Sequence, residues 1–259
     1  MEVTGLENEI SRLARKMKWP AVEQYKKHVK KDLPFEENLL LLLKLENDRR
    51  EGESLKRRIK LAGFPILKTL DTFEFDPAKL PFLKQEQVLE IALCDFIKER
   101  TNICAIGNCG TGKTHLMTAI GLEAIRKGFS VRFFRACDLA ARLSEAHSEK
   151  HLTGMLNALH KCQLLCVDEL GYMTLDSRSA QLLFQVFAGR YEVRSTMITS
   201  NLEFSRWPDF IGDQIMATAL VDRLVHRSAI LNMNGEGYRL SHSGQATLSC
   251  EGGAHNAQA

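Results

Sequence analysis

Apolar residues at the start of the chain recur with the period of an α-helix. Four of them are three or four positions apart and would share one helical face: Leu6, Ile10, Leu13 and Met17. Pro20 suits the first turn of a second, short helix that runs to about Val29. Strand-like alternation is absent from this stretch, so the beginning of the chain is predicted to be helical.

A long third helix is predicted in the stretch "PFEENLLLLLKLENDRREGESLKRRIKLAG". Gly63 and then Pro65 end it, because both residue types interrupt helices. Gly52 lies inside the stretch and weakens it, so we expect a kink there or a junction between two helices. Residues 1–66 are therefore predicted to form a small all-α N-terminal domain.

From Leu67 onward, short apolar runs alternate with helical stretches. A loop with two prolines and a helix at about 84–99 come first. Strands are then predicted in "TNICAIG", "FSVRFFRA", "CQLLCVDE" and "STMITSN", with helices between them. This repetition predicts an α/β fold over residues 67–240, with a mainly parallel sheet flanked by helices. Residues 241–259 hold no Lys or Arg and are predicted to be a disordered tail, which leaves no room for a separate helical lid.

Composition indicates where the protein works. No apolar run approaches the roughly 20 residues that span a bilayer, and the N-terminus has no apolar signal region. The seven cysteines contain no C-x-x-C pair and no metal-binding spacing, which favours reduced thiols. We therefore expect a cytoplasmic protein with no membrane contact.

Charge is distributed unevenly along the chain. Residues 1–60 hold 15 Lys or Arg against 11 Asp or Glu, a net +4, while the whole chain carries +3. One interpretation of such clusters is a solvated helix face. The other is a surface that contacts nucleic-acid phosphates. The candidates for such contacts are Lys26, Lys27, Lys30, Lys31, Arg49, Arg50, Lys56, Arg57 and Arg58.

One segment carries a specific chemical signature. Residues 107–114, "GNCGTGKT", match G-x-x-x-x-G-K-[ST] at every fixed position, between a predicted strand and a predicted helix. In such a P-loop, backbone N–H groups surround the phosphates. The lysine binds the β- and γ-phosphates, and the threonine hydroxyl ligates Mg²⁺. The predicted nucleotide-binding residues are Gly107, Asn108, Cys109, Gly110, Thr111, Gly112, Lys113, Thr114 and the following His115.

Two carboxylates end the apolar strand "LLCVDE". Asp168 is predicted to bind Mg²⁺ together with Thr114. Glu169 is predicted to polarise the water that attacks the γ-phosphate. No N-K-x-D sequence for guanine recognition occurs in the chain, which favours ATP over GTP. The predicted activity is therefore hydrolysis of ATP with Mg²⁺ as cofactor.

Two further residues are candidates for the same reaction. Asn201 ends the strand "MITSN", where its amide can hold the attacking water, and the alternative is a helix cap or turn residue. Arg223 is the best candidate for an arginine finger supplied to a neighbouring subunit. Arg227 and Arg239 are others, and a surface salt bridge is the alternative. A finger in trans requires a homo-oligomer with ATP sites at its subunit interfaces.

These elements, in this order, resemble the AAA+ ATPases of the helicase-loader and initiator branch. Residues 100–139, 164–207 and 219–240 resemble the IstB family, the transposition helper ATPases of bacterial insertion sequences; "DELGYM" and "STMITSNL" are the most specific parts. The resemblance covers about residues 67–240. It implies a Walker A loop at 107–114, a Walker B pair at Asp168 and Glu169, a sensor 1 at Asn201 and a finger at Arg223.

The resemblance also implies a task for this bacterial protein. IstB-like proteins assemble with ATP on double-stranded DNA without strong sequence preference, deform it and deliver it to a partner transposase, and hydrolysis controls disassembly. Two alternatives stay open. A replicative helicase loader of the DnaC type shares the same core. A nucleotide-gated scaffold would use ATP only to hold subunits together, although Glu169 argues against it because such a scaffold needs no water-activating acid.

Overall fold

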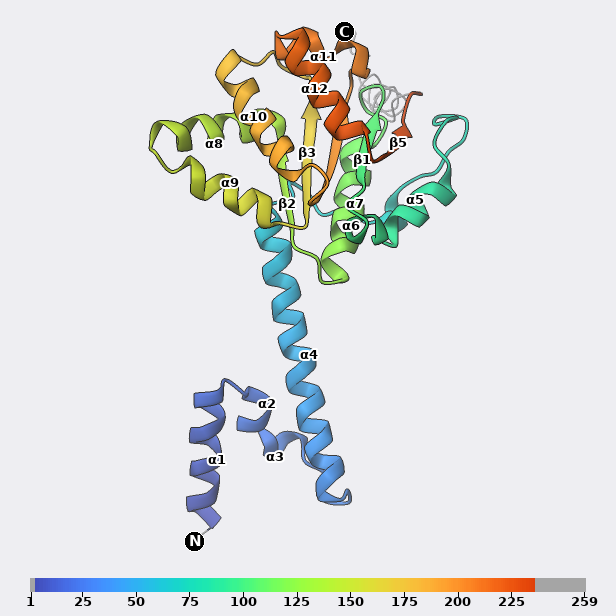
Figure 1. Cartoon of the computed structure of the whole chain (residues 1–259). Coiled ribbons are helices and arrows are strands. Elements are labelled where there is room, and N and C mark those ends of the chain that lie inside the picture. The colour runs from blue at the N-terminus through green and yellow to red at the C-terminus, as the bar shows by residue number, and fades with distance from the viewer. Residues whose placement is uncertain (1–2, 236–259) are drawn as a thin grey trace, which may run out of the picture. The chain divides into compact units, whose positions relative to one another are not determined.

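The structure, a computed structural model, describes residues 3–235, with side chains from residue 5 onward. The chain divides into two compact units, Met1–Arg58 and Ile59–Ala259. This division falls inside a single helix, α4 (Phe35–Ala62), which is labelled in Figure 1. The predicted tail at 241–259 lies outside the described residues.

The first unit contains the helices α1 (Val3–Met17), α2 (Pro20–Glu23) and α3 (Tyr25–His28) and most of α4. The predicted second helix is thus divided in two at Gln24. α4 runs through Gly52 as one helix, so the expected junction between two helices at this residue is wrong. A glycine inside a helix costs about 1 kcal/mol relative to alanine, which is small for a helix of 28 residues. Most of the apolar face of α1 is solvent-exposed: Leu6, Ile10, Leu13 and Met17 are 36–53% exposed.

The second unit is built on a five-stranded parallel sheet, counted over the described residues. Its strands are β1 (Asn102–Ile106), β2 (Val131–Arg135), β3 (Leu164–Leu170), β4 (Ser195–Ser200) and β5 (Ser228–Asn232). They lie in the order β2-β3-β4-β1-β5. The predicted α/β fold is confirmed. The edge strand β5 was not predicted.

Helices connect these strands in the manner of repeated β–α units. They are α5 (Gln85–Ala92), α6 (Asp95–Lys98), α7 (Lys113–Arg126), α8 (Ala136–Ser148), α9 (Leu152–Lys161), α10 (Ser177–Arg190), α11 (Trp207–Ile211) and α12 (Gln214–Val225). Two stretches predicted as single helices are each broken at a residue with left-handed backbone, Cys94 (φ 63°) and Lys150 (φ 62°). The described residues end at 235, three residues after β5, so the expected lack of a lid stays a prediction.

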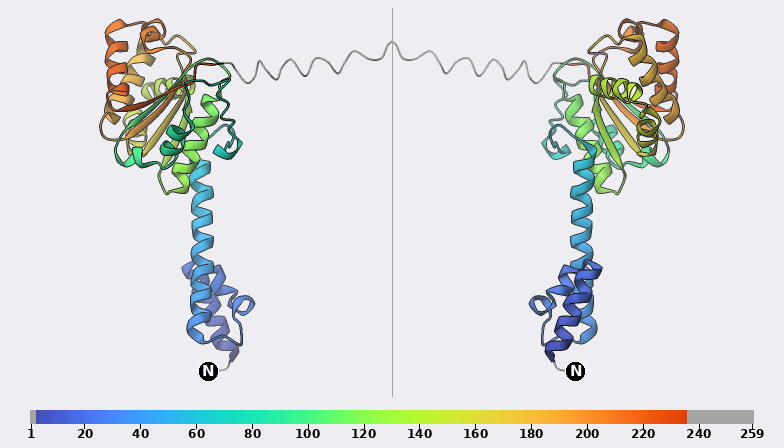
Figure 2. Two further views of the ribbon diagram at one scale, coloured as in Figure 1. Left: turned by 90° about the vertical axis from the view of Figure 1, so that its right-hand side faces the viewer. Right: turned by 90° about the vertical axis from the view of Figure 1, so that its left-hand side faces the viewer.

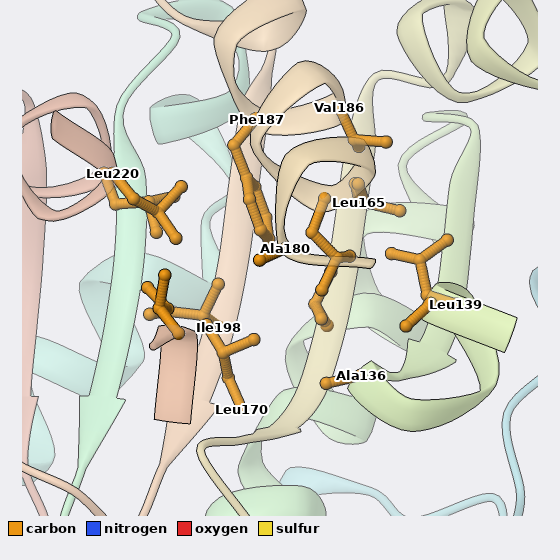
Figure 3. Close-up of a cluster of buried hydrophobic side chains, with 14 of the residues drawn as sticks. Ala136, Leu139, Leu165, Leu170, Ala180, Val186, Phe187, Ile198 and Leu220 are labelled. Carbon is orange, nitrogen blue, oxygen red and sulfur yellow. The ribbon is translucent and has the colours of Figure 1, made fainter. Parts of the chain in front are cut away.

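Helices cover both faces of the sheet, as the side views in Figure 2 show. One face packs against α8, α10, α11 and α12 in a continuous cluster that includes Leu139, Val186, Phe187 and Leu220 (Figure 3). The other face packs against α7, in which Leu116, Met117 and Ile120 are fully buried. Since all five strands are parallel, their carboxyl ends meet at one edge, and the candidate site lies there.

Candidate nucleotide-binding site

The P-loop begins where β1 ends and is held against two other strands. The N–H of Gly107 donates to the carbonyl of Ser200 at 3.1 Å, and Met233 just beyond β5 donates to the carbonyl of Ile106. A Cβ at Gly107 would overlap the backbone of Met233. Gly110 and Gly112 have left-handed φ values of 81° and 88°, which favour glycine. The motif glycines therefore shape the loop.

Lys113, the first residue of α7, reaches back across this loop. Its Nζ donates to the carbonyls of Gly107 at 2.7 Å and Asn108 at 2.6 Å, and the side chain is almost fully buried. The ammonium group is thus held over the loop together with the N-terminus of α7. Both features carry positive charge, so they favour an anion at this position.

Thr114 and Asp168 come together across the carboxyl edge of the sheet. Thr114 Oγ1 donates to Asp168 Oδ2 at 2.9 Å, and the Asp168 carboxylate is 1% exposed. The predicted pair of Mg²⁺ ligands is therefore in contact. Mg²⁺ usually takes one or two protein oxygens and completes its shell with phosphates and water. The donor set fits that pattern, and the described residues contain no cluster of three or more His, Cys, Asp or Glu side chains able to hold a metal.

Thr199 of β4 completes this network, and it was not among the residues selected from the sequence. Its buried hydroxyl donates to Asp168 Oδ1 at 2.5 Å and accepts the backbone N–H of Glu169 at 2.9 Å. The same oxygen therefore orients both Walker B acids. Its place near the end of β4, two residues before Asn201, was the only sequence signal.

Glu169 sits at an irregularity in β3. The pairing of β3 with β4 shifts register between Val167 and Leu170, and Glu169 has a left-handed φ of 60°. In a regular strand, neighbouring side chains point to opposite faces, and a bulge re-aims one of them. The backbone irregularity thus allows Asp168 and Glu169 to line the same pocket. Arg135, at the end of β2, lies 3.8 Å from the Glu169 carboxylate (Nε to Oε2).

Asn201 directly follows β4, next to the start of the P-loop. Its Oδ1 is buried without a hydrogen-bond partner among the described residues. Buried polar atoms nearly always have a partner, so an orphaned acceptor at a strand end indicates a site for water or ligand. The predicted role in holding a water fits this geometry.

Arg223 lies at the opposite end of β1 from the P-loop. The side-chain amide of Asn102, the first residue of β1, donates to the carbonyl of Arg223 at 3.5 Å. The Arg223 guanidinium donates to Ala219 and lies 4.8 Å from the ring centre of Phe184. Arg227 is at the same end, since its carbonyl accepts the N–H of Asn102. Neither arginine serves its own P-loop here, and Arg239 is outside the described residues.

A cavity of about 450 Å³ connects the P-loop with the segment that precedes α5. His115 Nε2 lies 2.9 Å from the carbonyl of Thr69 and its ring packs edge-on to Phe73, so it helps to fix this segment, and it also lines the cavity beside the P-loop. A Cβ on Gly112 would come within 2.9 Å of the Phe73 ring. The volume lies in the range of ligand pockets, about 300–1,000 Å³. The wall from Pro65 to Leu80 was not identified from the sequence.

The predicted nucleic-acid contacts of the first unit differ in their surroundings. The buried carboxylate of Glu46 accepts hydrogen bonds from Arg49 at 2.8 Å and Arg50 at 3.0 Å, and from the Ala21 N–H at 3.3 Å. These two arginines therefore help to hold α4 against the chain around Ala21. Lys26 pairs with Glu7, Lys56 pairs with Glu53 and Lys27 bonds Gln24. Among the described residues, no carboxylate lies within 4 Å of the side-chain nitrogens of the four remaining candidates, Lys30, Lys31, Arg57 and Arg58.

The described helices include none that is long and apolar enough to cross a membrane. The six described cysteines form no disulfide. Cys109, in the P-loop, is exposed and lies 3.1 Å from the hydroxyl of Tyr172.

Comparison with known proteins gives a consistent result. A family model described as IstB-like ATP binding protein matches residues 10–246. A relative from Geobacillus stearothermophilus, named as an ATP-binding protein of insertion sequence IS5376, is 39% identical over 223 residues, covering 86% of this chain and 87% of the relative. A relative from Pseudomonas aeruginosa, named likewise for insertion sequence IS21, is 36% identical over 217 residues, covering 84% and 81%.

Solved structures show the same fold at lower identity. The DnaC helicase loader aligns with a TM-score of 0.53 and 23% identity, covering 63% of this chain and 95% of that one. DnaA from Aquifex aeolicus, bound to AMPPCP, aligns with a TM-score of 0.53 and 20% identity, covering 65% and 51%. At these identities the likeness shows the fold alone: this chain shares with DnaC and DnaA the parallel α/β sheet flanked by helices.

Proposed function

Because the chain belongs to the IstB-like ATP binding protein family, we propose that it hydrolyses ATP and uses the cycle to assemble on double-stranded DNA in transposition. In this proposal it deforms the DNA and delivers it to a partner transposase, and hydrolysis controls disassembly. The relatives' names refer to insertion sequences and ATP binding, which supports the setting.

The observation that carries the hydrolysis is the network around Thr199. It holds Asp168 against Thr114, where Mg²⁺ would neutralise phosphate charge, and it fixes the backbone of Glu169 beside it. Glu169 is then placed to accept a proton from a water, and Asn201 to orient that water. A protein that used ATP only as a bridge between subunits would need neither a proton acceptor such as Glu169 nor a water-orienting residue such as Asn201.

The position of Arg223 supports an oligomer with shared sites. An arginine at the opposite end of β1 from its own P-loop cannot complete that site. In the proposed oligomer it would instead be supplied to the nucleotide of a neighbouring subunit. The contacts with Ala219 and Phe184 are the resting arrangement that such a finger would leave. Since each site would then need two subunits, assembly and hydrolysis are coupled.

The basic first unit supports DNA binding without base recognition, because lysine and arginine contacts with phosphates carry no sequence information. Several subunits acting together also offset the cost of bending DNA, which is of the order of 1–6 kcal/mol per site. The acidic partners of these basic residues indicate which of them are available to bind DNA phosphates. Arg49 and Arg50 are bound by Glu46, whereas Arg57 and Arg58 have no acidic partner in the described chain.

The DNA part is tested by salt-dependent binding of a fluorescent duplex to the full chain. Changing Lys56, Arg57 and Arg58 to Gln is expected to weaken binding and to flatten the slope of log K against log[salt] by about 0.9 for each DNA phosphate that is no longer neutralised. The matched control changes three basic residues of the second unit that pair with carboxylates: Lys98, Arg126 and Arg206. Equal slopes in the two variants would place the DNA contacts elsewhere.

The partner is tested by pull-down with two proteins in parallel, the transposase of the same insertion sequence and a replicative helicase. Retention of the transposase alone supports the proposal. Retention of the helicase alone would favour the second candidate, a helicase loader, whose fold the core shares.

A further inference from the structure

A second cavity, of about 360 Å³, lies in the core unit beside the edge strand β2. One wall is formed by residues 61–65, which pass along the strand, and the other by β2 and the first turns of α8. It is separate from the P-loop cavity, although Pro65 and Arg135 line both. Nothing in the proposed ATPase cycle uses the remainder of this cavity.

Guanidinium groups dominate the charge of this cavity. Arg132, Arg135 and Arg142 contribute +3 and Asp138 contributes −1, so its lining carries +2. Arg135 contacts Glu169 of the nucleotide site at 3.8 Å. The other two have no carboxylate within 4 Å in the described part of the chain. Unneutralised arginines that share a concave surface attract an anion, and their planar forks suit phosphate oxygens in particular.

The two unpaired guanidiniums are each held in place by the protein. Arg132 is half-buried and donates from Nη1 to the carbonyl of Leu61. Arg142, on α8, lies 5.6 Å from the ring centre of Phe134 on β2, in a cation–π contact. Less side-chain freedom is therefore given up when they bind a ligand, which favours affinity.

The rest of the lining is apolar and suits the carbon part of a phosphate ester. Pro65, Phe133 and Phe134 contribute to it, together with the exposed side chain of Leu61. A bare inorganic ion would leave this surface unused, whereas a sugar or base attached to the phosphate would cover it. The lining therefore combines two guanidinium groups, which can bind phosphate oxygens, with an apolar surface that can contact the carbon part of the ligand.

We propose that this cavity is a second phosphate-binding site, independent of the P-loop, that takes a phosphate ester through Arg132 and Arg142. Two sources share this chemistry, a free nucleotide and a backbone phosphate of DNA. The site does not depend on the proposed function, because neither Arg132 nor Arg142 lines the nucleotide cavity.

The test compares two double variants of the full chain that lose equal charge. One is Arg132→Gln with Arg142→Gln. The control is Arg126→Gln with Arg206→Gln, which removes two exposed arginines outside the cavity. Arg135 is left unchanged because it also borders the nucleotide site.

The first arm measures binding of AMP, a phosphate ester without β- and γ-phosphates, by calorimetry in a Lys113→Ala background, which removes the ammonium group of the P-loop. If the cavity takes a free nucleotide, the Arg132/Arg142 variant binds at least tenfold more weakly than the control. The second arm measures duplex DNA binding against salt. If the cavity takes a backbone phosphate, the slope of log K against log[salt] falls by up to about 1.8, that is about 0.9 for each of two arginines that neutralise a phosphate.

Either effect supports the site and identifies its ligand source, and the absence of both overturns it. Melting curves followed by circular dichroism check that the variants fold. If the double variant is unfolded, Arg142→Glu alone replaces it, because Arg142 is exposed and packs on the Phe134 ring without holding two elements together by a hydrogen bond. A wild-type chain that binds no duplex at all would refute the proposed function, while the AMP arm would still test the proposed cavity site.

Discussion

Thr199→Val removes one buried hydroxyl and tests how the two acids of the site are positioned. The substitution keeps the shape of the side chain but loses the bond to Asp168 at 2.5 Å and the bond from the Glu169 N–H at 2.9 Å. A hydrogen bond to a charged group is worth about 1.5–3 kcal/mol, and a buried donor left without a partner costs about 1–3 kcal/mol. Because Glu169 is only partly buried, water can reach its N–H, and we expect a loss of about 2–3 kcal/mol.

That loss has a thermal and a catalytic consequence. For a domain of 150–250 residues, about 1 kcal/mol shifts Tm by roughly 2–4 °C, so Tm is expected to fall by about 4–12 °C. Left-handed backbone at a non-glycine residue stores about 1–3 kcal/mol, and the Thr199 hydroxyl helps to hold Glu169 in it. If this conformation is released, kcat for ATP hydrolysis falls roughly 5- to 150-fold, since about 1.4 kcal/mol corresponds to a factor of ten.

The assay is steady-state ATP hydrolysis beside binding of a fluorescent ATP analogue, which is expected to change less than about threefold because the P-loop is untouched. Thr196→Val is the matched control. It is equally buried on the same strand, but its hydroxyl accepts from Arg190 at 3.1 Å, far from Asp168 in the strand register. Thr199→Ser keeps the hydroxyl and should restore activity. If Thr199→Val retains the kcat of Thr196→Val, the positioning argument is refuted.

Three other substitutions test separate parts of the account. Glu169→Gln is expected to bind ATP, hydrolyse it at least about 100-fold more slowly and stay on DNA, as followed by fluorescence anisotropy; rapid release in ATP would contradict its role as the base. Gly112→Ala should weaken ATP binding at least tenfold in an equilibrium titration, because the new Cβ combines a φ of 88° with a 2.9 Å approach to Phe73; unchanged affinity would show that the loop relaxes freely. Burial raises the pKa of Glu46, but hydrogen bonds from Arg49 and Arg50 outweigh it and leave the pKa lowered. The stability that Glu46 contributes is therefore present above the pKa of its unfolded state and is lost as pH falls through the pKa of its folded state. Glu46→Gln should thus make the melting temperature less sensitive to acid. An unchanged dependence of the melting temperature on pH would show that the Glu46 carboxylate does not stabilise the first unit.

The parts of the site that follow from local sequence could be predicted in advance. A P-loop is contiguous and its backbone conformation depends on its own glycines, so Gly107 to Thr114 are recognisable without any tertiary information. Asp168 and Asn201 could be placed because the ends of parallel strands meet at one edge. The structure brings Thr114 into contact with Asp168 beside the P-loop and places Asn201 directly after β4, and the expected α/β fold is confirmed.

What escaped prediction depends on tertiary contacts. Thr199 looks like an ordinary buried strand residue until the register of β3 against β4 places it between two acids. The breaks at Cys94 and Lys150 need left-handed backbone at residues that rarely adopt it, so the helical pattern continues across them. The strand β5 is five residues long and only two residues separate it from the end of α12, and such short apolar segments fit either structure.

The exposed apolar face of α1 is a second example of a feature that depends on tertiary contacts. Its spacing predicted a helix correctly, but spacing alone does not say what covers the apolar face. Likewise, the sequence of a basic cluster does not show whether its side chains pair with a carboxylate. Glu46 binds Arg49 and Arg50, whereas Arg57 and Arg58 have no acidic partner in the described chain.

The most direct test of the central claim is electron microscopy of the full chain on duplex DNA, with and without a non-hydrolysable ATP analogue, and with Lys113→Ala as the matched control. We expect ordered assemblies on DNA only when the wild-type protein and the analogue are both present, since ATP would join the P-loop of one subunit to Arg223 of the next. Equal assemblies without the analogue, or with Lys113→Ala, would contradict the account.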